Sequence, residues 1–112
     1  MFRDDTTRLH HMLDAACEAI VFAQGHARID LNGDRMLVLA LVKAIEIIGE
    51  AAYQVSLETR EQWPGIPWED IIGMRHRLVH AYFAINLDIL WGTVRDDLPP
   101  LVEALQKVLG AV

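Results

Sequence analysis

Basic charge and cysteine are both scarce in this chain, and each shortage excludes a class of protein. The formal net charge is −6 over 112 residues, which excludes a broad basic surface that would bind polyanions without selectivity. The single cysteine, Cys17, excludes a disulfide framework within one chain and a cysteine metal site. Because the chain is acidic overall, any nucleic-acid site must be confined to a small part of the surface. Because it has one cysteine, we expect it to work in a reducing, cytoplasmic environment.

Long uncharged hydrophobic runs are also missing. The longest apolar stretch, "MLVLALVKAIEII", is interrupted by Lys43 and Glu46. No basic N-terminal segment leads into a hydrophobic run of the kind found in signal peptides. We therefore expect neither a membrane span nor secretion.

Alternation of polar and apolar residues with period two is absent over any window of a strand's length, whereas apolar spacing of three and four residues is common. An all-α bundle of four to five helices is therefore predicted, as a single domain over residues 1–112. The first helix should follow the acidic segment "RDDTT" and stop near Gly25. The second should run from Asp34 to about Ser56 and should be the most buried.

The C-terminal half should hold the remaining helices. Pro67 suits the first turn of a third helix, which we expect to end around Tyr82 to Ile85. Asn86 can cap the start of a fourth helix. The tandem prolines at 99 and 100 should kink or break it, with Asp96 or Asp97 capping a final segment to about Leu109.

Polar residues on the second predicted helix form one narrow stripe. Lys43, Glu46 and Glu50 stand at positions i, i+3 and i+7, on one face of an otherwise apolar helix. The stripe can face either solvent or a site.

The segment "GMRHRLVHAYF", residues 73–83, concentrates the reactive side chains of the chain. Arg75, His76, Arg77 and His80 form a basic island with no acidic residue between positions 70 and 88. The simplest interpretation is the solvated face of an amphipathic helix. Tyr82, by the same reasoning, packs its ring on the bundle and leaves its hydroxyl at the rim.

A second interpretation of the basic island is chemical. Arg75 and His80 are separated by roughly 140° around a helix, so they would meet only in a groove against another helix or a second subunit. A guanidinium can clamp phosphate oxygens, and an imidazole titrates near neutral pH and can move a proton. Because RNA supplies its own nucleophile, the 2′-hydroxyl, such a pair could cleave RNA without a metal or any other cofactor.

A metal site is the competing chemistry. His76 and His80 are four residues apart and share a helix face, which is half of a zinc site. Further ligands could come from Glu46, Glu50, His10 or His11, and the spacing selects none of them. We therefore predict no metal.

The segment "IPWEDIIGMRHRLVHAYFAINLDILWGTVRDDLPPL" resembles the HepT-like branch of the HEPN superfamily. The match includes the HEPN motif R-x4-H, here Arg75 and His80, and the HepT extension H-x-Y, here His80 and Tyr82. "KAIEIIGEAA" in the second predicted helix is similar to this family as well. His76 stands where Asn commonly follows the arginine in this branch.

The resemblance implies a small all-α protein that forms a homodimer, in which two R-x4-H motifs meet to make a metal-independent ribonuclease site. His76 and Arg77 would support Arg75 and His80 there. It further implies a toxin role, with RNA as the substrate. The partner would be an antitoxin of the minimal nucleotidyltransferase type, which transfers AMP to Tyr82. The alternative is a non-catalytic module that binds a nucleotide or a partner through the same island.

Overall fold

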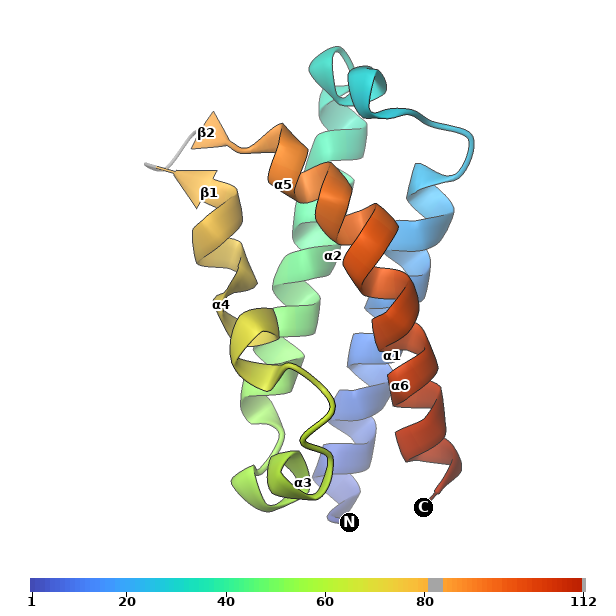
Figure 1. The fold of residues 1–112 in the computed structure, drawn as a ribbon, viewed down its shortest axis with the longest axis vertical. Coiled ribbons are helices and arrows are strands. Elements are labelled where there is room, and N and C mark those ends of the chain that lie inside the picture. The colour runs from blue at the N-terminus through green and yellow to red at the C-terminus, as the bar shows by residue number, and fades with distance from the viewer. Residues whose placement is uncertain (81–83, 112) are drawn as a thin grey trace.

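Two long helices, α1 (Arg3–Ala23) and α2 (Arg35–Gln54), form the body of the protein and pack along each other (Figure 1). The computed structural model describes residues 1–80 and 84–111, with the backbone alone at positions 79 and 80. Gly25, with φ of +76°, ends the first helical segment in a conformation that glycine adopts without strain. A short 3-10 turn, Arg28–Asn32, leads into α2. Both predicted helices are confirmed, although α1 already begins at Arg3 and includes the segment "RDDTT" that was expected to precede it.

The remaining helices cover two sides of this pair. Figure 1 shows α4 (Trp68–Leu78) beside α2 and α6 (Leu98–Gly110) beside α1, and both contacts are extensive. The described residues form five helices in all: α1, α2, α3 (Leu57–Gln62), α4 and one continuous helix that ends in α6. The all-α prediction is therefore confirmed. No helix among the described residues is long and apolar enough to span a bilayer.

The core lies between α1, α2 and the C-terminal helices. Small residues on α1 let α2 approach closely, and large aliphatic residues of α2 fill the centre. The outer face of α2 is less buried than the sequence predicted, since it leaves Met36 83% and Tyr53 67% exposed. The fully buried large side chains are Leu9, Met12, Leu41, Ile45, Ile48, Leu78, Leu90, Leu98 and Leu105.

The tandem prolines do not end the C-terminal helix. α5 (Leu87–Gly92) continues through a π turn, Thr93–Asp97, directly into α6. In that turn the N–H of Leu98 donates to the carbonyl of Thr93, five residues back. The prolines stand in the first turn of α6, where their missing N–H groups interrupt the α-helical pattern and the wider π turn absorbs the change. The expected side-chain cap by Asp97 is absent, because the backbone there is already helical.

The third predicted helix is shorter than expected. α4 ends at Leu78, and the chain then forms a strand, β1 (Val79–His80), that pairs antiparallel with β2 (Ala84–Ile85). The carbonyl of Leu78 accepts from the N–H of Asn86 at 2.7 Å, so it is not available to continue the helix. The predicted end between Tyr82 and Ile85 was therefore wrong. Asn86 caps α5 as predicted, since its side chain accepts from the N–H of Ile89 at 3.0 Å.

A short helix, α3 (Leu57–Gln62), was not predicted from the sequence. Hydrogen bonds at its N-terminal end hold the start of α1 in place. Asp5 is only 3% exposed, and its carboxylate accepts from the N–H of Ser56 at 2.9 Å. It also accepts from the hydroxyls of Ser56 and Thr59, both at 2.6 Å. This carboxylate therefore joins segments more than fifty residues apart in the sequence.

Asp5→Ala is expected to lower the free energy of unfolding by about 3 kcal/mol, because it leaves the partly buried donors of Ser56 and the buried hydroxyl of Thr59 unpaired. Burial raises the pKa of Asp5, but hydrogen bonds from Ser56 and Thr59 outweigh it and lower the pKa overall. The carboxylate's contribution is thus complete above the pKa of an unfolded aspartate and is lost as pH falls through the lower folded-state value. Urea denaturation should show the gap between wild type and variant closing on acidification.

The neighbouring Asp4 is exposed, so Asp4→Ala is the matched control and should leave stability nearly unchanged. An Asp5→Ala gap that stays constant from neutral to acid pH would contradict the role given to the ionised carboxylate.

Candidate functional site

A hollow of about 240 Å³ opens between α2 and α4, and two residues of the basic island, Arg75 and His76, line it. The two helices approach closely at Gly49, where an added Cβ would lie 3.2 Å from the carbonyl oxygen of Ile71. This contact is tighter than most Cβ atoms make, so glycine is favoured at this spacing. The lining residues are Ile45, Glu46, Gly49, Glu50, Tyr53 and Gln54 from α2, and Ile72, Arg75 and His76 from α4.

Arg75 is the best-defined functional side chain of the hollow. Its Nε donates to Oε1 of Glu46 at 3.1 Å, which links α4 to α2. The arginine side chain remains 56% exposed and the glutamate 23% exposed. The guanidinium is thus held at one nitrogen while much of it stays open to solvent, as a group that binds a ligand anion must be.

The other basic residues of the island divide between two places. His76 lines the same hollow as Arg75. Arg77 turns to the other side of α4, where it donates to the Asp70 side chain at 3.4 Å and to the Asp70 carbonyl at 2.9 Å. All three residues lie in the last turn of α4, where positive charge also stabilises the helix dipole. The structure therefore brings Arg75 and His76 together and places Arg77 apart from them.

The R-x4-H motif crosses from a helix into a strand. Arg75 is on α4, whereas the backbone of His80 is on β1 and pairs with Ala84. The roughly 140° separation expected on a continuous helix therefore does not apply. The side chain of His80 and the whole of Tyr82 lie outside the described residues, so their predicted roles stay predictions.

Glu46, considered as a metal ligand from the sequence, is engaged by Arg75. Within the part of the chain that the structure describes, no group of three or more His, Cys, Asp or Glu side chains is placed to hold a metal ion. Three residues of the site were missed as site residues: Gly49, Tyr53, and Glu46 as the arginine's partner. The polar stripe on α2 was the available signal, and through Glu46 and Glu50 it borders the hollow.

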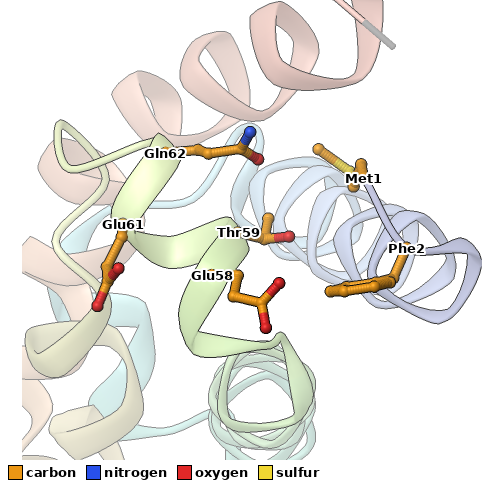
Figure 2. Close-up of a pocket in the computed structure, with 6 residues that line it drawn as sticks. All are labelled: Met1, Phe2, Glu58, Thr59, Glu61 and Gln62. Atoms are coloured by element: carbon orange, nitrogen blue, oxygen red, sulfur yellow. The ribbon is translucent and has the colours of Figure 1, made fainter.

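A second hollow, of about 500 Å³, lies between the start of α1 and α3 (Figure 2). Figure 2 shows Glu58 and Gln62 directed toward Met1 and Phe2, with Glu61 pointing away. No basic side chain is among its lining residues, so it offers no arginine or lysine to a phosphate. The hollow beside Arg75 is the better candidate for binding an anion.

Known proteins resemble this chain over most of its length. It is 32% identical over 106 residues to "Putative RNase MJ1380" of Methanocaldococcus jannaschii, covering 95% of this chain and 97% of that protein. It is 36% identical over 101 residues to "Putative RNase TTE0752" of Caldanaerobacter subterraneus, covering 90% of each. It is 37% identical over 79 residues to "Probable ribonuclease HepT" of Thermococcus cleftensis, covering 70% and 72%.

A family model described as "Ribonuclease HepT-like" matches residues 12–108, which include every residue that lines the hollow between α2 and α4. No solved structure gives a significant match. The resemblance expected from the R-x4-H-x-Y motif is confirmed, and the chain belongs to the HepT-like family.

Proposed function

We propose that this protein is a metal-independent endoribonuclease that acts as the toxin of a toxin–antitoxin pair. One observation supports this proposal above all. Arg75, the arginine of the R-x4-H motif, has a half-exposed side chain and is held at the edge of a hollow. The names of the similar proteins, which call them RNases, support the same activity.

In the proposed reaction His80 takes the proton of an RNA 2′-hydroxyl. The 2′-oxygen then bonds to phosphorus, and the bond between phosphorus and the 5′-oxygen breaks. The leaving oxygen takes up a proton, so the products are a 2′,3′-cyclic phosphate and a 5′-hydroxyl. Arg75 stabilises the charge that develops on the phosphorane oxygens, and His76 adds a second polar group to the same hollow.

A homodimer is part of the proposal, with α4 at the interface and two motifs forming one composite site. Four apolar residues of α2, Met36, Leu39, Ile47 and Tyr53, are exposed, and Tyr53 also lines the hollow. Exposed apolar side chains that gather on one face commonly mark protein interfaces. A second copy packed against this side of α2 would cover them and bring two basic islands together.

Regulation by AMP transfer completes the proposal. A partner nucleotidyltransferase would join the α-phosphate of ATP to the phenolic oxygen of Tyr82 and release pyrophosphate. Tyr82 is two residues from His80, so the added phosphate would place negative charge and bulk beside the RNA site. RNA would be repelled and blocked.

Purified protein is expected to cleave RNA in the presence of excess chelator, leaving 2′,3′-cyclic phosphate ends. Its molar mass, measured by light scattering, should be twice that of one chain. Cleavage that disappears with chelator would contradict the metal-independent mechanism, and a strictly monomeric active protein would contradict the composite site. RNA or nucleotide binding without cleavage would favour the non-catalytic module instead.

A further inference from the structure

Glu46 is the residue that binds the side chain of Arg75 among the described residues, and the proposed reaction assigns it no role. Its Oε1 accepts the single hydrogen bond that Arg75 makes among the described residues, through Nε. Glu46 is also the more buried partner of the pair, because α2 presents it toward α4. The less mobile side chain of the two is therefore the carboxylate.

We propose that Glu46 is a positioning residue that presents Arg75 to the scissile phosphate, a role that rests on the proposed ribonuclease function. A guanidinium carries five donors in a fixed plane. Glu46 occupies the donor on Nε, the nitrogen nearest the backbone. Both terminal nitrogens are then left for phosphate oxygens, in the two-point arrangement that guanidinium groups favour.

Positioning of this kind has a measurable benefit. An exposed arginine loses rotamer freedom when it binds a ligand, and a partner that restricts the side chain beforehand reduces that loss. A displacement of about 1 Å in a reacting group can reduce a rate by about a hundredfold. Gly49, one turn from Glu46, fixes the helix spacing and so the distance over which Glu46 must reach.

The negative charge of Glu46 acts against the binding of an anionic substrate, and this gives the role a specific signature. Glutamine keeps the shape and an acceptor oxygen for Nε but removes the charge. Glu46→Gln should therefore keep kcat close to that of wild type, with an equal or lower KM for RNA. Glu46→Ala loses the acceptor and should lower kcat by about tenfold to a hundredfold.

Glu18 is the matched control. It is an exposed glutamate on α1, lines neither of the two hollows described above, and no hydrogen bond to it is present among the described residues. Glu18→Ala removes the same charge from the protein without touching Arg75. We expect its kcat to equal that of wild type.

The experiment measures kcat and KM on one RNA for wild type, Glu46→Ala, Glu46→Gln and Glu18→Ala, with urea denaturation to show that each variant is folded. An inactive wild type would overturn the proposed function and, with it, the role of Glu46. An active wild type with an unchanged or faster Glu46→Ala would overturn the role of Glu46 alone. A glutamine variant as slow as the alanine variant would mark Glu46 as a group that transfers a proton, which also overturns positioning.

Discussion

Replacing His80 with alanine is expected to slow RNA cleavage by about a hundredfold to ten-thousandfold, because positioned proton transfer contributes that much to a rate. The variant should still bind RNA, since Arg75 and the hollow beside it remain. Rates of cleavage and affinities for RNA, measured on the same preparation, separate the two effects.

His10→Ala is the matched control for His80. His10 is an exposed histidine on α1 and lines neither the hollow between α2 and α4 nor the one beside α3. Its removal changes the histidine content equally but should leave the cleavage rate unchanged. Undiminished cleavage by His80→Ala, or an equal loss in both variants, would contradict the assignment of His80 as the proton acceptor.

Tyr82→Phe is expected to abolish modification by the cognate nucleotidyltransferase, and its RNA cleavage should become resistant to that partner. Phenylalanine keeps the ring and lacks only the oxygen that accepts AMP, so folding and toxicity should survive. Mass spectrometry after incubation with ATP and the partner should show AMP-sized additions on wild type and none on the variant.

The chain contains two tyrosines, which provides an internal control. Tyr53 is 67% exposed on α2 and lines the hollow near Arg75, so it is accessible to a modifying enzyme as well. Tyr53→Phe should be modified like wild type. Modification that persists in Tyr82→Phe, or modified wild type that still cleaves RNA, would leave Tyr82 without the proposed regulatory role.

The helices could be predicted where their ends depend on local chemistry. Gly25 and Asn86 mark boundaries through a positive φ and a side-chain cap, both properties of single residues. The end of α4 could not be predicted, because it depends on a hydrogen bond from Asn86 to Leu78 and on pairing between Val79 and Ile85. The spacing of apolar residues within one segment does not predict a hydrogen-bond partner from a later segment of the chain.

The site was predictable to a similar extent. Arg75 could be identified because the R-x4-H motif, and the basic island around it on an acidic chain, are visible in the sequence. The polar stripe that contains Glu46 was visible as well. Which helix packs beside that stripe depends on the tertiary structure, however, so the contact between Glu46 and Arg75 could not be predicted. Arg77 is a different case, because it lies seven residues after Asp70 on the same helix and their contact is made within α4.

The contact between Gly49 and the backbone of α4 also bears on how this protein can tolerate sequence change. Side chains in a core can be exchanged for others of similar volume, and the helices shift slightly to accommodate them. At Gly49, however, the backbone of α2 lies against the backbone of α4, and an added Cβ would lie 3.2 Å from the carbonyl oxygen of Ile71. A side chain at position 49 would therefore require the neighbouring backbone to shift by a few tenths of an ångström, so this position tolerates less change than the core side chains around it. Such a shift would also move Arg75 relative to Glu46, which lies three residues before Gly49.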